Sequence, residues 1–291
     1  MEELPIRYLR VTGVRRLGPH LTRVTFGGAD LAGFTWTEPC QQVKLYFPKP
    51  GQAAPKLPPP DAGFLRWYQA FNAVPEPEQP WTRSYTLRGQ SAGANTIDID
   101  FVVHDGDGHS GPATRWARRA QPGDTLAMFG PSAMFARPTP LVASIAEAGW
   151  VLLAGEETAL PAIGALLESL PEGRRALAYL EVAGPSDEQR FDSRGDVEVH
   201  WLHRGEVPAG HSDILLEAVR AAEFPAGQAF AWIAGESSSV RALRRYLIHN
   251  RGLDKKAIEF TGHWRLALTQ DDAPTAEDLA EAQERLAAAQ G

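Results

Sequence analysis

The sequence has a single cysteine, Cys40, in 291 residues, and it has no long apolar run. One thiol can form neither an internal disulfide nor a thiolate metal cluster, so we expect Cys40 to pack as a small apolar residue. The longest apolar run, Trp150–Ala154, is far shorter than the ~20 residues of a membrane-spanning helix. The first ten residues begin acidic and lack the apolar stretch of a secretory signal. We therefore expect a cytoplasmic protein without a membrane segment.

An excess of positive charge is also lacking. The chain has 29 Lys and Arg against 36 Asp and Glu, a net charge of −7. This balance argues against nucleic acid as a partner, because phosphate neutralisation needs a basic surface. A small basic pocket for an anionic ligand remains compatible with it. We expect a monomer, since no dimer interface is evident.

Side-chain clusters for acid–base or metal chemistry are missing as well. We find no carboxylate pair and no Cys–His pair that would suggest proton-transfer or nucleophilic catalysis, so no catalytic side chain is predicted. His200, His203 and His211 are near one another in sequence but follow no recognised ligand spacing. No metal site is predicted.

The first half of the chain is predicted to be β structure. Its segments are short, β-branched or alternating, and bounded by glycine and proline. A proline-rich excursion at 48–63 separates them, and one helix is expected over 113–120. We predict a small antiparallel barrel over residues 1–137. The expected strands are 7–14, 21–27, 42–47, 83–88, 96–104 and 125–129.

In the second half, strands alternate with helices, which is typical of a doubly wound parallel sheet. We place this α/β domain at residues 138–268 and a short Ala- and Glu-rich C-terminal helix within a tail at 269–291. The expected strands are 149–154, 175–183, 196–202, 229–234 and 257–261, and the expected helices are 159–170, 213–222 and 237–250.

Residues 83–86, Arg-Ser-Tyr-Thr, open a strand directly after a proline-rich segment. On a strand, Arg83 and Tyr85 share one face, while Ser84 and Thr86 share the other. A guanidinium can bind a pyrophosphate through two hydrogen bonds, a tyrosine can stack on a planar ring, and a hydroxyl can bond the ring edge. A flavin dinucleotide offers all three groups. The tetrapeptide by itself more often marks an exposed strand start in which Arg and Tyr pack on each other.

The tetrapeptide Gly111-Pro112-Ala113-Thr114 opens the helix of the first half. Free backbone N–H groups and the positive end of the helix dipole bind phosphate. Gly111 and Ala113 let the backbone approach a ligand closely, and Thr114 can donate its hydroxyl. A plain turn before a helix is the alternative. Because Arg83 lies in the same half, the two segments together favour a nucleotide cofactor.

These motifs carry a resemblance. The stretches R-S-Y-T, D-I-D-F-V-V-H, G-P-A-T-R-W-A-R-R-A-Q-P-G-D, L-L-A-G-E-E-T-A-L-P-A-I, A-W-I-A-G-E-S-S-S-V-R-A-L-R-R-Y-L and G-H-W-R occur in this order. The chain resembles, over about residues 5–265, the siderophore-interacting proteins of the ferredoxin–NADP reductase superfamily. The resemblance implies an FAD-binding barrel over 1–137 and an NAD(P)H-binding-like domain over 138–268. It implies an FAD-dependent oxidoreductase that reduces ferric siderophores and releases Fe(II), with electrons from NAD(P)H or a reduced ferredoxin.

The resemblance also assigns roles at the cofactor. Arg83 would bind the FAD pyrophosphate, Tyr85 would stack on the isoalloxazine, and Ser84 or Thr86 would hydrogen-bond the ring. His104 would lie near the adenine or the ribityl chain. The backbone of Gly111, Pro112, Ala113 and Thr114 would hold phosphate, and Trp264 would cover the other face of the flavin.

For the anionic ferric siderophore, the resemblance implies a basic pocket. Lys44 matches a family position, and Arg265 and Arg245 are further candidates, with Arg241 an alternative. A solvated strand residue is the alternative for Lys44, and the wet face of a helix is the alternative for Arg245. The chain departs from the family's Gly-Tyr-Trp-Arg-Gly by having His263 in place of tyrosine and Leu266 after Arg265.

The α/β half lacks G-x-G-x-x-G. Acidic turns, Gly155-Glu156-Glu157 and Gly235-Glu236, instead follow two of its expected strands, where a nicotinamide dinucleotide would lie. Carboxylates are poor neighbours for a pyrophosphate, so we predict weak NAD(P)H binding. Two other functions stay open. One is a general NAD(P)H–flavin oxidoreductase with another acceptor, and the other is a siderophore-binding protein without turnover.

Overall fold

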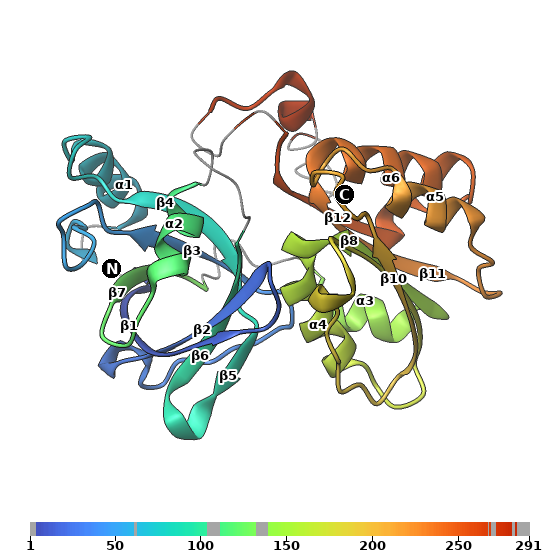
Figure 1. The fold of residues 1–291 in the computed structure, drawn as a ribbon, viewed down its shortest axis with the longest axis horizontal. Helices are drawn as coiled ribbons and strands as arrows, with labels where there is room; N and C mark the ends of the chain where they lie inside the picture. Colours follow the sequence, from blue (N-terminus) through green and yellow to red (C-terminus); the bar gives the residue numbers. More distant parts are fainter. Residues whose placement is uncertain are drawn as a thin grey trace. The chain divides into compact units, whose positions relative to one another are not determined.

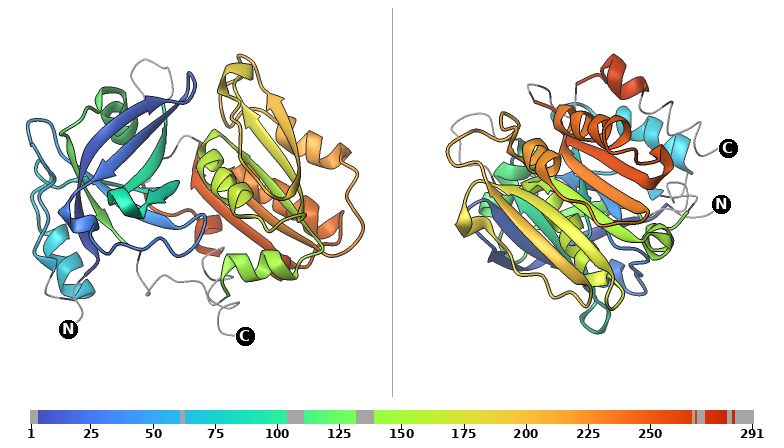
Figure 2. Two further views of the ribbon diagram at one scale, coloured as in Figure 1. Left: turned by 90° about the horizontal axis from the view of Figure 1, so that it is seen from below. Right: turned by 90° about the vertical axis from the view of Figure 1, so that its right-hand side faces the viewer.

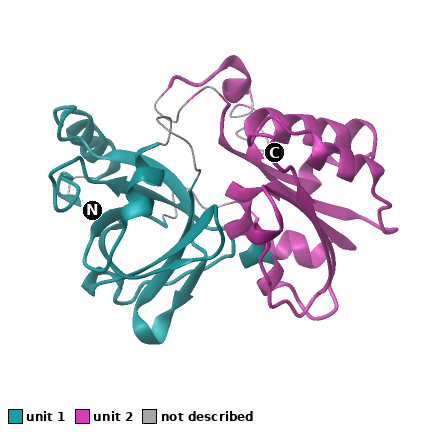
Figure 3. Ribbon diagram, viewed as in Figure 1, with its two compact units in different colours: residues 1–136, 164–166 teal, residues 137–163, 167–291 magenta. Residues whose placement is uncertain are grey.

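The computed structural model describes residues 4–60, 63–103, 111–131, 139–266, 268, 272–280 and 283. The chain divides into two compact units (Figure 3). Unit 1 comprises residues 1–136 and 164–166, and unit 2 comprises residues 137–163 and 167–291. None of the helices in the described ranges is both long and apolar enough to cross a bilayer.

Unit 1 contains a seven-stranded antiparallel sheet with the order β4-β3-β7-β1-β2-β6-β5 (Figure 1). The sheet curls into a half-barrel, so that Tyr85 of β4 packs on Phe101 of β6 with ring centroids 4.5 Å apart. The predicted antiparallel barrel is confirmed. Its strands are β1 (Ile6–Arg16), β2 (Leu21–Gly27), β3 (Gln42–Phe47), β4 (Trp81–Thr86), β5 (Gly89–Ser91), β6 (Thr96–Val102) and β7 (Thr125–Phe129).

Helix α2 (Pro112–Arg119) packs its apolar face on the barrel interior. The Trp116 ring lies 5.7 Å from that of Phe47 and 5.6 Å from that of Phe101. Proline suits the first turn of this helix because the missing N–H would have no intrahelical partner. Burial of one such aromatic side chain contributes about 2–3 kcal/mol, so the core holds the helix start in place.

Two helices and the short strand β5 were not anticipated from the sequence. Helix α1 (Phe64–Asn72) follows the proline-rich excursion, and its Trp67 and Phe71, one turn apart, pack on Tyr46 of the outer barrel face. Helix α3 (Leu141–Glu147) follows the predicted boundary between the two domains at residues 137 and 138. The apolar pair in α1 is a helical signal, but the surrounding prolines obscure it.

Unit 2 contains a five-stranded parallel sheet with the order β10-β9-β8-β11-β12. Helices α5 and α6 cover one face, and α3 and α4 cover the other (Figures 1 and 2). The predicted doubly wound sheet is confirmed. Its elements are β8 (Trp150–Glu156), α4 (Leu160–Ser169), β9 (Arg175–Val182), β10 (Asp196–His203), α5 (Ile214–Ala221), β11 (Ala229–Glu236), α6 (Ser237–His249) and β12 (Ile258–Trp264).

Shorter helical pieces complete the chain. Residues 276–280 are helical, which confirms a short C-terminal helix. Thr275 caps it, because the Asp278 N–H donates to Thr275 Oγ1 at 3.2 Å and the Thr275 N–H donates to Asp278 Oδ2 at 2.8 Å. The 3-10 turns are η1 (Ala29–Leu31), η3 (Ala92–Ala94), η5 (Glu157–Ala159), η6 (Pro185–Asp187) and η7 (Lys255–Ala257).

Candidate functional site

Strand β4 carries residues 83–86 and lies antiparallel to β3. In this register Lys44 is opposite Ser84, and Lys44 Nζ donates a hydrogen bond to Ser84 Oγ at 3.2 Å. Burial, and the neighbouring Arg83 guanidinium, lower the pKa of Lys44. The fold therefore places the expected siderophore cation beside the expected flavin strand.

The side chains of Arg83 and Tyr85 occupy the barrel side of β4. Arg83 is opposite Leu45 and Tyr85 is opposite Val43, and both partners belong to the core. Arg83 Nη1 donates to the Thr82 carbonyl at 2.8 Å. Burial raises the pKa of the Tyr85 phenol, so the ring stays neutral. Thr86, at the end of β4, is buried.

Arg88 belongs to a buried ion-pair cluster. Asp100 accepts two hydrogen bonds from Arg23, at 2.6 and 2.8 Å, and its Oδ2 lies 3.9 Å from Arg88 Nε. The Asp100 side chain has no exposed surface, and that of Arg88 is 9% exposed. Arg88 is thus a buried cation beside a buried carboxylate.

The start of α2 has no side-chain cap in the described part of the chain. Gly111 is the N-cap residue, and a Cβ built on it would meet no atom within 4 Å. Thr114 Oγ1 donates to the Val102 carbonyl at 3.4 Å, so its hydroxyl bonds β6 within the barrel. His104 lies outside the described residues. The first turn of α2 offers backbone N–H groups for an anion.

Two cations at Trp81 were missed by the sequence analysis. Lys49 Nζ lies 4.3 Å from the Trp81 ring centroid, and Arg115 Cζ lies 5.9 Å from it. Arg115 is one turn into α2, so this contact joins the helix start to the first residue of β4. These segments together supply guanidinium, ammonium, hydroxyl and free N–H donors and a tyrosine ring. This combination suits a flavin dinucleotide with its pyrophosphate.

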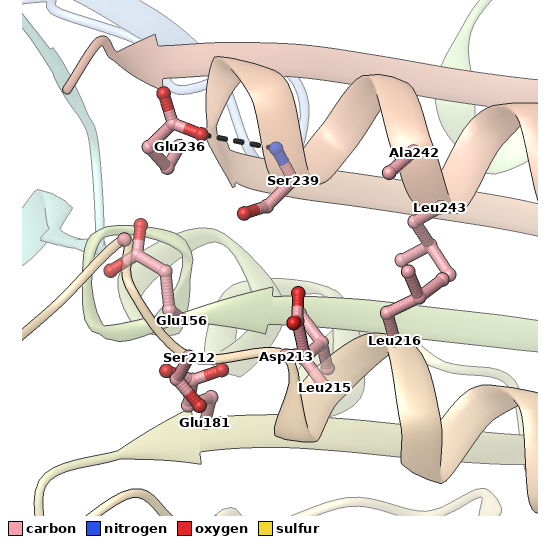
Figure 4. Close-up of a pocket in the computed structure, with 11 residues that line it drawn as sticks. Glu156, Glu181, Ser212, Asp213, Leu215, Leu216, Glu236, Ser239, Ala242 and Leu243 are labelled. Carbon is pink, nitrogen blue, oxygen red and sulfur yellow. Dashed lines mark hydrogen bonds between the residues drawn. The ribbon is translucent and has the colours of Figure 1, made fainter. Parts of the chain in front are cut away.

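In unit 2, carboxyl groups gather at the carboxyl ends of the strands (Figure 4). Glu156, Glu181 and Glu236 end or nearly end β8, β9 and β11, and all three are buried. Burial, and the neighbouring Glu157, raise the pKa of Glu156 to about 8. Burial also raises the pKa of Glu181 to about 7. Glu157 forms a buried ion pair with Arg204.

The expected flavin-covering residue, Trp264, ends β12. Its indole Nε1 donates to Glu156 Oε1 at 3.1 Å. His263 Nδ1 lies 3.1 Å from the Thr158 carbonyl, and burial lowers the pKa of His263 to about 4. The histidine that replaces the family's tyrosine is thus a neutral, packed side chain.

The C-terminal segment binds Arg265. Its Nη1 lies 2.9 Å from Asp278 Oδ2 and donates to the Ala273 carbonyl at 3.1 Å, and its Nη2 donates to the Asp272 carbonyl at 3.2 Å. Arg245 lies on α6 along a cation-rich groove of about 290 Å³. The other groove residues are Arg241, Arg244, Ile248, His249, Lys255, Glu277 and Ala280.

Among the described residues, no three His, Cys, Asp or Glu side chains are arranged to hold a metal ion. Instead, His200 and His203 each lie beside a different glutamate carboxylate. His200 Nε2 is 3.1 Å from Glu198 Oε1, and His203 Nε2 is 2.8 Å from Glu188 Oε1. Because each histidine has such a neighbour, neither points to a shared metal centre.

Two family models match this chain. The siderophore-interacting FAD-binding domain matches residues 10–135, and the siderophore-interacting protein model matches residues 148–267. Ferric vibriobactin reductase ViuB of Vibrio cholerae is 31% identical over 91% of each chain. The NADPH-dependent ferric-chelate reductase of Escherichia coli is 30% identical over 90% of this chain and 94% of its own.

Solved structures of related proteins are also similar to this chain. A siderophore utilization protein from T. fusca is 36% identical, with a TM-score of 0.77 over 93% of this chain and 97% of its own. A flavohemoglobin from Malassezia yamatoensis and a ferredoxin NADP+ reductase from Neisseria gonorrhoeae share the fold, with TM-scores of 0.61 and 0.57 at 13% identity. The fold and the matched FAD-binding domain define an FAD-dependent oxidoreductase. The chain belongs to the siderophore-interacting protein family, which confirms the resemblance seen in the sequence.

Proposed function

We propose that the protein reduces ferric siderophores in the cytoplasm through FAD and releases Fe(II), with electrons from NAD(P)H or a reduced ferredoxin. The observation that carries the proposal is the pairing of Lys44 with Ser84, which joins a cation to the strand of Arg83 and Tyr85. This strand lies within residues 10–135, which match the family's FAD-binding domain. The related reductases of V. cholerae and E. coli support the substrate class.

Bound FAD supplies the electron transfer, and the chain binds and orients it. We assign Arg83 and the α2 start at Gly111, Pro112, Ala113 and Thr114 to the pyrophosphate. Tyr85 packs on the ring system, and Ser84 or Thr86 hydrogen-bonds the ring edge. We assign His104 to the adenine or ribityl side and Trp264 to the second face of the ring, as the family pattern implies. Lys49 and Arg115 add positive charge beside β4.

The substrate is an anion, and the proposed contacts are cations. Lys44 is the first candidate because it lies beside the flavin strand. Arg265 and Arg245 are further candidates, although Arg265 already binds Asp278. Fe(II) carries less charge than Fe(III) and binds hard oxygen ligands less strongly, so reduction itself loosens the complex. No protein acid or base is needed for this step.

We propose three functional segments: an FAD-binding barrel over residues 1–137, an NAD(P)H-binding-like domain over 138–268 and a tail over 269–291. The protein is proposed to work as a monomer. A division between residues 135 and 148 is supported by the two family models, which match residues 10–135 and 148–267.

An anaerobic titration tests the function. The purified protein should be yellow, its flavin absorbance should bleach on reduction by NADH, NADPH or reduced ferredoxin, and a ferric siderophore should restore it. Restoration by quinones or free flavin alone would indicate a general flavin oxidoreductase. A colourless protein without FAD affinity would exclude the reductase and leave a binding protein.

A further inference from the structure

Helix α6 begins with its N-terminal N–H groups already bound by a side chain. Glu236, the last residue of β11, accepts hydrogen bonds from the backbone N–H groups of Ser238 at 2.7 Å and Ser239 at 3.0 Å. Figure 4 shows the bond to Ser239. Its other carboxylate oxygen accepts a bond from the Leu266 N–H at 3.1 Å. Burial alone would raise the pKa of Glu236, but these hydrogen bonds outweigh burial and lower it. A negative charge is therefore fixed at the start of α6.

A second carboxyl group occupies the equivalent place after β8. Glu156 Oε2 accepts a hydrogen bond from the Thr158 N–H at 3.0 Å, in the 3-10 turn that leads into α4. Gly235 makes room for it, because a Cβ at that position would lie 3.0 Å from Glu156 Oε1 and its φ of +147° suits glycine alone.

These two positions flank the point where the strand order reverses. β8 and β11 are neighbours, and the chain winds from β8 toward β10 on one side and from β11 toward β12 on the other. In doubly wound sheets a nucleotide binds at this crevice, with its phosphates on helix N-termini.

The space that remains there is small and acidic. The cavity bounded by Glu156, Glu181, Asp213 and Glu236 encloses about 40 Å³. Such a volume holds about a few water molecules and no pyrophosphate. A dinucleotide phosphate would have to displace carboxyl groups that are held by backbone hydrogen bonds.

We propose that Glu156 and Glu236 are specificity-determining residues for the electron donor. Their carboxyl groups occupy both helix starts at the switch point, so NAD(P)H binds weakly and without its phosphates at either site. The inference rests on the proposed reductase function and narrows the range of its electron donors. NAD(P)H supplies electrons only at high concentration. A donor that needs no phosphate site is favoured.

Binding of NADP⁺ and NAD⁺ to the full-length FAD-loaded protein tests this, measured by isothermal titration calorimetry. The oxidised forms bind without reducing the flavin. Glu236→Ser removes the carboxylate, and serine still caps a helix. We expect its Kd for at least one dinucleotide to fall at least fivefold, and that of Glu236→Gln, which removes only the charge, to fall about threefold. Glu172→Gln is the control, because Glu172 is exposed just before β9, at the opposite edge of the sheet.

A wild-type Kd below about 1 µM would overturn the inference. A change of less than twofold in the dinucleotide Kd of both Glu236 variants would also overturn it. If Glu236→Ser fails to fold, the Kd of Glu236→Gln alone decides. Reoxidation of the dithionite-reduced protein by a ferric siderophore needs no dinucleotide. Its failure would count against the reductase function and leave the donor result standing.

Discussion

Lys44 on β3 and Ser84 on β4 are joined by a hydrogen bond of 3.2 Å, although 40 positions separate them in the chain. Lys44 lies on the exposed side of β3, and partial burial, together with the nearby Arg83, lowers the pKa of its ammonium group. Two cations on adjacent strands raise the local positive potential of a chain that is acidic overall. The half-barrel thus brings together two cations that the proposed pyrophosphate and siderophore contacts would use.

Arg83→Ala should weaken FAD retention. A charge-assisted bond to a pyrophosphate contributes about 1.5–3 kcal/mol, which corresponds to a rise of roughly 10- to 100-fold in the Kd for FAD. Fluorescence titration of the apoprotein with FAD measures this Kd. Arg66→Ala, at an exposed site on α1, serves as the control and should leave the Kd unchanged. Equal retention in both variants would contradict the assignment of Arg83.

Lys44→Ala should affect the substrate more than the cofactor. We expect the KM for an anionic ferric siderophore to rise about three- to tenfold, because one partly desolvated charge contact is lost, while FAD content stays the same. Raising the ionic strength should narrow the gap between wild type and variant. Lys56→Ala provides the comparison, since Lys56 is exposed and pairs with Glu78. An unchanged KM in Lys44→Ala would mean that the cation acts elsewhere.

Asp100→Asn should destabilise unit 1. Removing one partner of a buried ion pair leaves charge uncompensated and costs about 3–5 kcal/mol, and Asp100 serves both Arg23 and Arg88. Urea unfolding monitored by circular dichroism measures the loss. Glu78→Gln, at the exposed pair with Lys56, should change stability by less than about 0.5 kcal/mol. A loss below about 1 kcal/mol for Asp100→Asn would show that the cluster tolerates the missing charge.

Stability should fall as the pH rises from 6.5 to 8.5. The folded-state pKa of Glu156 is about 8 and that of Glu181 about 7, both above the usual value, so the folded chain binds more protons than the unfolded chain in this range. Buried His263, with a pKa of about 4, acts oppositely but only below about pH 6.5. Two carboxyl groups outweigh the one histidine, so the fall in stability begins well below pH 6.5 and continues up to about pH 8.

For Glu156 the loss between pH 6.5 and 8 is about 2 kcal/mol. Thermal melts across this range should show a falling Tm, and Glu156→Gln should flatten the slope because it removes the titrating proton. A slope that is as steep in Glu156→Gln as in the wild type would assign the pH dependence to other groups. Glu172→Gln, at an exposed carboxylate, should keep the wild-type slope.

Local sequence patterns were enough to predict most of the helices and strands of this protein. The alternation in Thr96–Val102, the helix start at Pro112 and the alternating elements of unit 2 are short-range signals, and each predicted element was found. The motif of Arg83 to Thr86, read with the later motifs, also pointed to the family. These features arise from residues that are close together in the sequence, so sequence patterns alone can predict them.

Tertiary structure decided which side chains meet. Lys44 reaches Ser84 only through strand register, and Arg88 is buried because Asp100 of another strand lies beside it. The acidic turns were visible in the sequence, but the bonds that Glu156 accepts from Trp264 and Glu236 accepts from Leu266 depend on how the end of β12 meets the ends of β8 and β11. Such contacts join residues far apart in the chain, and only the packed sheet brings them within hydrogen-bond distance.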